Sequence, residues 1–192
     1  MKRALFYGFI AVLISACTQD YQPKPYAYFR IDLPEHAYKP IPEGFDYSFE
    51  IPIYAEVQRR KEKNWININY PEFNAQIHIT YKAVDNNLGE YLEESRSLAF
   101  NHAQRADGIT ESVYHDDSLN VHGLLYEIEG SAASSAQFYL TDSMRHFLRG
   151  ALYFRAIPNP DSLAPVNQFI LEDIRHLMET TRWTSGSGSV DK

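Results

Sequence analysis

The stretch GSAASSAQFYLTDSMRHFLRGALYF, residues 130–154, concentrates the side chains that could carry out nucleophilic catalysis. It brings together the hydroxyl, carboxylate and imidazole groups of a serine hydrolase triad, at Ser131, Ser134, Ser135, Asp142, Ser143 and His146. An α/β hydrolase carries its serine in a Gly-x-Ser-x-Gly turn, and here no second glycine follows Gly130 before Gly150. We therefore predict no catalytic residue. A serine hydrolase stays an alternative, with its nucleophile and base drawn from Ser134, Ser135, His122 and His146.

The alternation of the same stretch favours a hairpin of two strands. Apolar or small residues occupy every second position, the period of a half-buried strand, at Ala136, Phe138, Leu140, Leu148, Gly150, Leu152 and Phe154. Asp142 suits the turn between the strands, where its carboxylate can accept a backbone hydrogen bond. Because arginine and aromatic residues are enriched at interfaces, the opposite face is a candidate protein-contact face, with an ordinary solvated face as the alternative. Its residues are Arg145, Phe147, Arg149, Tyr153 and Arg155.

The histidines show no spacing typical of a metal site. The pattern His-Glu-x-x-His, which places two zinc ligands on one helix face, is absent. The compact group His115-Asp116-Asp117 is followed by Ser118 and Asn120, a composition typical of a turn. The glycines near it are isolated, so no phosphate-binding loop is present. The sequence predicts no metal and no cofactor.

The first 16 residues predict a signal peptide. Lys2 and Arg3 precede an apolar run over residues 4–14, which is shorter than the roughly 20 residues of a membrane-spanning helix. The next residues, Ile14-Ser15-Ala16-Cys17, match the bacterial lipobox. That resemblance implies cleavage before Cys17 and acyl chains such as palmitate on the modified cysteine, and several chains give stable membrane anchoring.

Charge and cysteine content narrow the function classes. Removal of Lys2 and Arg3 would change the formal net charge from −7 to −9, which argues against nucleic acid as a partner because nucleic acid requires a basic surface. Cys17 is the only cysteine, so no disulfide can form within the chain.

The remaining chain predicts one domain behind a tether. Residues 17–44 contain five of the ten prolines, and we expect a lipidated tether that is partly docked. Residues 45–183 are predicted to form an α+β domain and residues 184–192 a flexible tail. Period-2 and helical patterns predict strands at 47–53, 65–70, 75–82, 109–115, 121–130, 136–141 and 146–154, with helices at about 88–102 and 161–181.

The order βββ-α-ββββ-α indicates a mostly antiparallel sheet of about seven strands with two main helices packed on it. In element order alone, this layout is similar to the PsbP and Mog1 sandwich. Such a likeness concerns the fold and carries no function.

Several longer strings, in order, resemble one family. They include YFRIDLPEHAY, YSFEIP, YLEESRSLAF and the stretch at residues 130–154, and they extend from about Tyr21 to Trp183. Together they resemble the gliding motility-associated lipoprotein GldD family. The resemblance implies a cell-envelope lipoprotein required for surface gliding, in a machinery linked to type IX secretion, with no known enzymatic activity. Cys17 is the only functional residue that it carries over.

We accordingly expect a non-enzymatic accessory or assembly component of the gliding machinery. Its expected partners are the membrane, through the lipid on Cys17, and other gliding or secretion proteins of the envelope. Thr18 replaces the aspartate that is associated with inner-membrane retention in some bacteria, so the outer membrane is favoured, with the domain facing the periplasm. A small-ligand-binding lipoprotein module is a further alternative.

Overall fold

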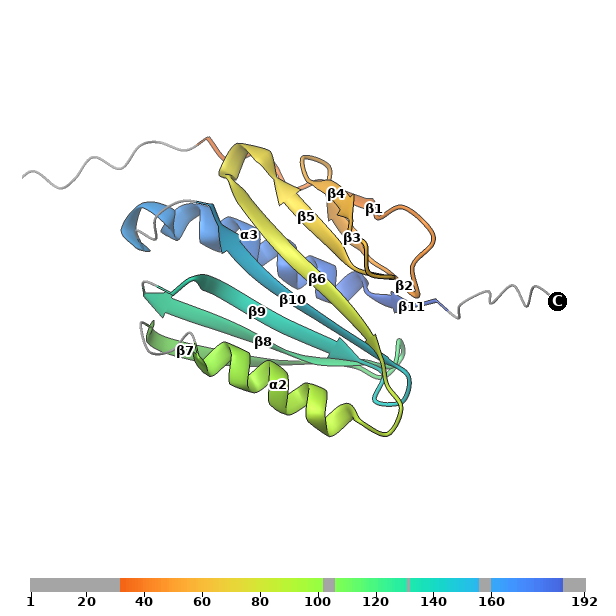
Figure 1. Ribbon diagram of the computed structural model, residues 1–192. Coiled ribbons are helices and arrows are strands. Elements are labelled where there is room, and N and C mark those ends of the chain that lie inside the picture. The colour runs from red at the N-terminus through yellow and green to blue at the C-terminus, as the bar shows by residue number, and fades with distance from the viewer. Residues whose placement is uncertain (1–31, 102–105, 131, 156–159, 185–192) are drawn as a thin grey trace, which may run out of the picture. The chain divides into compact units, whose positions relative to one another are not determined.

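The main sheet has seven strands, and all neighbouring strands are antiparallel (Figure 1). The computed structural model describes residues 32–101, 106–130, 132–155 and 160–184. Cys17, the predicted signal peptide, the first part of the tether and residues 185–192 lie outside the described residues. In sheet order the strands are β4 (Glu56–Arg59), β5 (Ile66–Tyr70), β6 (Ala75–Ala83), β10 (His146–Phe154), β9 (Ser134–Thr141), β8 (Val121–Gly130) and β7 (Ala106–Asp116).

Two helices cover opposite faces of this sheet (Figure 1). Helix α2 (Leu88–Asn101) runs along the lower edge of the sheet in Figure 1 and packs on β8 and β9, whereas helix α3 (Pro160–Thr180) lies behind the sheet. A single-turn helix, η1 (Pro71–Phe73), joins β5 to β6. The α+β class, the mostly antiparallel sheet and the two main helices predicted from sequence are confirmed.

One predicted strand differs from the structure. Residues 47–53 lie outside the main sheet and form two short strands, β2 (Tyr47–Ser48) and β3 (Glu50–Pro52). These pair with β11 (Arg182–Trp183) and β1 (Tyr38–Pro40), respectively. Pro52 has no N–H to continue a ladder. The seventh strand of the main sheet is instead β4, whose mostly polar sequence EVQR gives no apolar alternation.

The main core fills the space between the sheet and α3. It contains the inward residues of β5, β6, β9 and β10, and Gly150 is essential to it because a Cβ there would lie 2.2 Å from ring carbons of Phe138. A smaller cluster beneath α2 contains Ala99, Tyr126 and Ile128. Both faces of the sheet are therefore buried where a helix crosses them.

The described part of the tether packs on α3. The side chain of Asp173 on α3 is fully buried, and three groups surround it: His36 Nδ1 at 2.8 Å, Tyr38 Oη at 3.1 Å and Tyr54 Oη at 2.9 Å. Burial raises the pKa of Asp173, although these hydrogen bonds partly oppose the shift. The segment that leads to Cys17 is thus held to the domain through a buried carboxylate.

Candidate functional site

The structure separates the groups of the serine hydrolase alternative. Ser134 lies opposite Tyr153 on β10, and His146 is at the other end of that strand. Seven residues at about 3.3 Å each put roughly 23 Å between these ends. His122 lies opposite Thr141, at the same end as His146. Neither imidazole can therefore act as the base for Ser134 or the adjacent Ser135.

Each of these polar groups has a structural partner instead. The Ser135 hydroxyl donates to Asn167 Oδ1 at 2.6 Å. His146 is buried, its Nδ1 lies 2.7 Å from Tyr81 Oη, and its ring stacks on Trp183. Burial lowers the pKa of His146, which favours the neutral ring. Asp142 accepts hydrogen bonds from the backbone N–H groups of residues 144–146, which confirms the predicted turn.

The predicted protein-contact face is not one exposed surface. The alternation did place its residues on the side opposite the main core, but α2 covers part of that side. Phe147 is 3% exposed and packs between Tyr91 and Tyr139. Arg149 is half-buried, and its Nη2 donates to Gln137 Oε1 at 2.5 Å. Phe147 is therefore unavailable to a partner.

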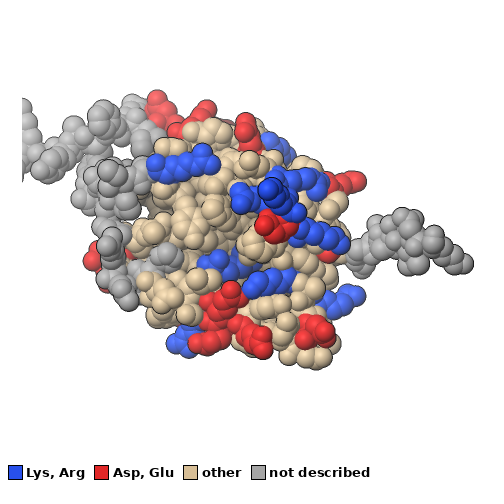
Figure 2. Space-filling model, in the orientation of Figure 1, with Lys and Arg blue, Asp and Glu red and all other residues tan. Residues whose placement is uncertain are grey.

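The other half of this side is open and polar. It comprises the outward residues of β4, β5, β6 and the end of β10, together with two flanking arginines. We call it the open half-face: the exposed or half-buried Gln58, Arg60, Asn69, His78, Thr80, Tyr153 and Arg155, with Glu56 at its rim and with the buried Asn67 and Gln76 beneath them. Figure 2 shows Lys and Arg side chains over the middle of this part of the molecule, with Asp and Glu along the lower edge, where α2 lies, and also along the upper rim.

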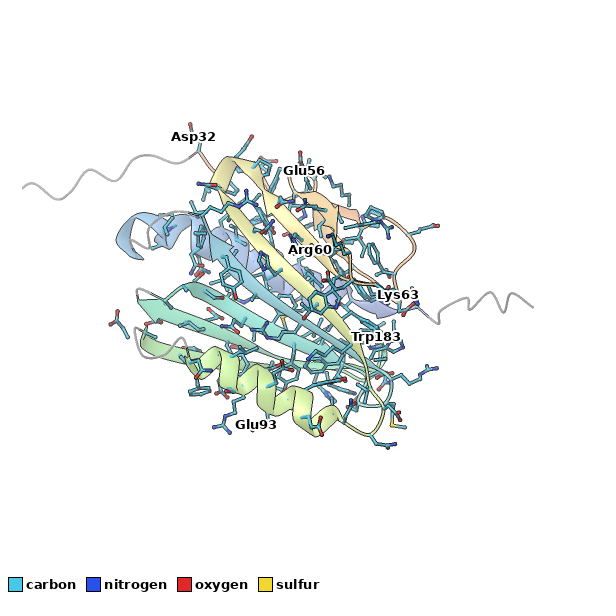
Figure 3. The ribbon with its side chains drawn as sticks, viewed as in Figure 1. Asp32, Glu56, Arg60, Lys63, Glu93 and Trp183 are labelled. Atoms are coloured by element: carbon cyan, nitrogen blue, oxygen red, sulfur yellow. The ribbon has the colours of Figure 1, made fainter. Side chains whose placement is uncertain are left out.

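The electrostatic character of the open half-face is locally positive. His78 lies exposed near its centre, as its outward position in the sequence predicts, and its Nε2 lies 2.6 Å from Gln76 Oε1. Partial desolvation of its ring, followed by the charges of Arg60 and Arg155, lowers the pKa of His78. Figure 3 shows Arg60 in front of the sheet and Glu56 at the upper rim. A hollow of about 650 Å³ opens beside Glu56 and Arg155.

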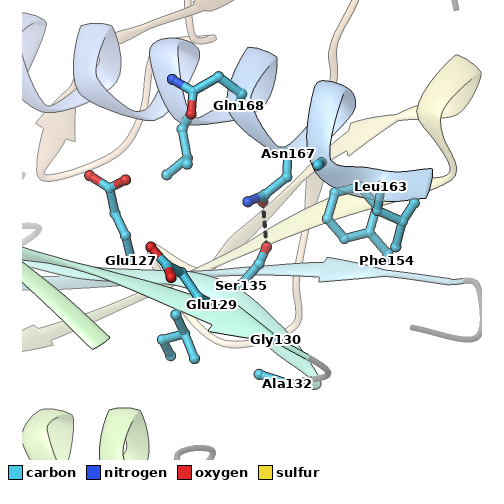
Figure 4. A pocket seen from close by; sticks show the side chains of 12 residues that line it. Glu127, Glu129, Gly130, Ala132, Ser135, Phe154, Leu163, Asn167 and Gln168 are labelled. Carbon is cyan, nitrogen blue, oxygen red and sulfur yellow. Dashed lines mark hydrogen bonds between the residues drawn. The ribbon is translucent and has the colours of Figure 1, made fainter. Parts of the chain in front are cut away.

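A second hollow lies on the opposite side of the sheet, between α3 and the ends of β8 and β9 (Figure 4). Its volume is about 240 Å³, below the range of roughly 300–1,000 Å³ usual for small-molecule sites. Ser135 and Asn167 bond to each other across it, and Glu127 accepts from Arg175 at 2.5 Å. Its small volume and these two internal pairs do not favour a small ligand in this hollow.

The turn between β7 and β8 carries a cluster that the sequence analysis treated only as a turn. The turn is present, since Asp116 Oδ1 accepts from the N–H groups of Ser118 and Leu119. In addition, the antiparallel register places His122 directly opposite His115. Together with Asp117 they offer three ligand-type atoms within 4.8 Å of one another, and these side chains are the only such group in the part of the chain that the structure describes.

Comparison with known proteins identifies the family. Within the described residues, no helix has the length and apolar character needed to cross a membrane. No curated protein sequence matches the chain. A family model, described as gliding motility lipoprotein GldD, matches residues 18–183, which include the whole described part of the domain up to Trp183. The chain therefore belongs to the gliding motility lipoprotein GldD family.

Proposed function

We propose that this protein is a membrane-anchored lipoprotein of the cell envelope that acts without catalysis, as an accessory or assembly component of the gliding machinery linked to type IX secretion. Membership of the GldD family makes it a gliding motility-associated lipoprotein and indicates an envelope location. Cys17, in its lipobox, is the proposed site of the lipid. The outer membrane is the proposed location, with the domain in the periplasm.

The open half-face is the proposed contact surface, and it is the observation that carries this function. Its side chains are amides, a tyrosine and arginines, which suit hydrogen bonding to a protein surface. The proposed occupant is the acidic surface of another envelope protein, because Arg60 and Arg155 both act on His78 of this face while the chain as a whole is acidic. Electrostatic complementarity of this kind accelerates association and selects partners.

The anchor is tested with Cys17→Ala. We expect the variant to appear in the soluble fraction and the cells to lose gliding. A variant that retains its signal peptide, is exported and supports full gliding in soluble form would contradict the anchored role.

The contact surface is tested with the double variant Arg60→Glu and Arg155→Glu. Cells carrying it should glide poorly, and whole-cell crosslinking should recover less of the partner. Arg96→Glu is the matched control, because Arg96 is an exposed arginine on α2 rather than on the open half-face. Normal gliding and undiminished crosslinking in the double variant would refute the assignment of this surface.

A further inference from the structure

The turn between β7 and β8 holds two histidines whose ring nitrogens face each other. His115 Nδ1 and His122 Nδ1 are 2.8 Å apart, and the ring centroids are 4.6 Å apart. The other nitrogen of each ring faces an oxygen: His115 Nε2 lies 2.8 Å from Asp117 Oδ1, and His122 Nε2 lies 3.2 Å from Asn120 Oδ1. Four side chains thus form one continuous chain of polar contacts.

The neutral side chains have one hydrogen too few to satisfy all of these contacts. Asp117 as a carboxylate and Asn120 through its amide oxygen can only accept, so both Nε2 atoms must carry hydrogens. A neutral imidazole has one ring hydrogen. Both Nδ1 atoms therefore bear lone pairs, and at 2.8 Å these lone pairs repel each other unless a proton or a metal cation lies between them.

We propose that this cluster, the hairpin histidine site, binds one divalent transition-metal ion through His115 Nδ1 and His122 Nδ1, with Zn²⁺ as the reference ion. Imidazole nitrogen is a preferred ligand of zinc, copper and nickel. Ligating histidines usually donate their second N–H to a carboxylate or amide oxygen, which fixes the ring orientation. Asp117 and Asn120 occupy those positions here.

The geometry requires only a small adjustment. Zn–N bonds of about 2.0–2.1 Å in tetrahedral geometry separate two nitrogens by roughly 3.3 Å, against 2.8 Å in the structure. The side chains of His115 and Asp117 are 58% and 84% exposed, so the rings can turn without disturbing the core. The same exposure leaves the remaining coordination positions to water, which is typical of an open site rather than a closed structural one.

The turn itself is held in place before any ion binds. Within the turn, Asp116 Oδ1 accepts hydrogen bonds from the backbone N–H groups of Ser118 and Leu119. From the other side, the indole N–H of Trp183 donates to the backbone carbonyl of Asn120 at 3.0 Å. Trp183 in turn stacks on the buried His146. Two ligands on a supported turn lose less conformational entropy on binding than two ligands on a free loop.

The site is tested by titrating the full-length protein, purified in detergent, with Zn²⁺ in a calorimeter. We expect one ion per chain, with affinity reduced at least about tenfold in His115→Ala and in His122→Ala. Asn120→Ala should weaken binding by about 10–100-fold, the usual effect of removing an orienting group. His78→Ala is the control, because His78 is an exposed histidine outside the cluster and its loss should leave the affinity unchanged.

The competing arrangement needs no metal. If the Asn120 amide rotates by 180°, its NH₂ supplies the missing hydrogen and the four side chains satisfy one another. Electron paramagnetic resonance with Cu²⁺ separates the two, since coupling to two nitrogens is expected in the wild type and to at most one in His115→Gln. Absence of Zn²⁺ binding, equal affinity in the histidine variants, or an unchanged Cu²⁺ spectrum in His115→Gln would overturn the proposal. These outcomes do not depend on the proposed role in gliding.

Discussion

Replacement of Asp173 by alanine should loosen the attachment of the described part of the tether to α3. The Asp173 carboxylate, on α3, is where His36, Tyr38 and Tyr54 converge. No other carboxylate lies within hydrogen-bonding distance of Tyr54 Oη among the described residues. Without Asp173, His36, Tyr38 and Tyr54 lose their common acceptor. The segment then keeps the ladder of β1 with β3 and the ring contacts of His36 with Phe169 and of Tyr38 with His176.

The magnitude follows from the number and burial of these bonds. A hydrogen bond to a charged group contributes about 1.5–3 kcal/mol, so three donors set an upper bound of roughly 5–9 kcal/mol by the same rule. His36 and Tyr38 are only half-buried and can bond to water once released. Removing the carboxylate also recovers the desolvation cost that raises its pKa. We therefore expect a loss of about 2–4 kcal/mol in the free energy of unfolding.

Glu172→Ala provides a matched control one residue away. Glu172 Oε2 lies 3.0 Å from His36 Nε2, but its side chain is 54% exposed, so the loss should stay below about 1 kcal/mol. Urea unfolding measures both variants, and hydrogen exchange at Ile53, whose N–H donates to the Ala37 carbonyl, reports release of the tether. Equal losses in the two variants, or unchanged exchange in Asp173→Ala, would refute the reasoning.

Four further substitutions test the core and the pH dependence. Gly150→Ala should cost about 1–3 kcal/mol by overpacking against Phe138, whereas Gly89→Ala, with open space at its Cβ, should stabilise α2 by up to about 1 kcal/mol; equal effects in urea unfolding would contradict this. Burial alone would raise the pKa of Asp142, but three backbone N–H donors hold it below its usual range. The ionised Asp142 should therefore stabilise the fold. The free energy of unfolding of the wild type minus that of Asp142→Asn should be positive at neutral pH and should fall as the pH drops below about 3.9. The pKa of Asp173 is raised, so the same difference for Asp173→Asn should change in the opposite direction: the wild type should lose stability as the pH rises above about 3.9. If the two differences changed with pH in the same direction, both assignments would be refuted.

The strands of the main sheet were predictable because their signal is local. In β5, β6, β9 and β10 every second residue is buried against α3, and period-2 alternation records that burial directly. The same signal misassigned residues 47–53. Tyr47, Phe49 and Ile51 are buried as their alternation predicts, but they contribute to the core from outside the sheet. Alternation shows that one face is buried, not which element buries it.

Predicting that a helix covers half of the candidate contact face would have required an inference about tertiary packing. Alternation correctly placed Phe147 and Arg149 opposite Leu148 and Leu152, yet it gives no information on what packs there. A usable signal was available in the helix at residues 88–101, whose apolar stripe needs a surface of its own. Because α3 already covers one face of the sheet, the second helix could bury that stripe only on the other face.

The hairpin histidine site was missed for a similar reason. Metal motifs in sequence depend on short fixed spacings along one element, whereas His115 and His122 meet across two strands. The strands at 109–115 and 121–130 were both predicted. Pairing them across the intervening turn places His115 opposite His122, so the register of a predicted hairpin was the signal that could have located the pair.

The charge of the open half-face shows why a whole-chain sum is a limited guide to partners. The net charge of −7 is a sum over the whole chain. Glu93 on α2 lies at the lower edge in Figure 3, away from Arg60. The accessible side chains of the face include the amides of Gln58 and Asn69, which both donate and accept and so match peptide groups better than a row of phosphates. A polyanion would need many more cations than this face carries. The arrangement therefore favours a protein surface with a few well-placed carboxylates over any uniformly charged polymer.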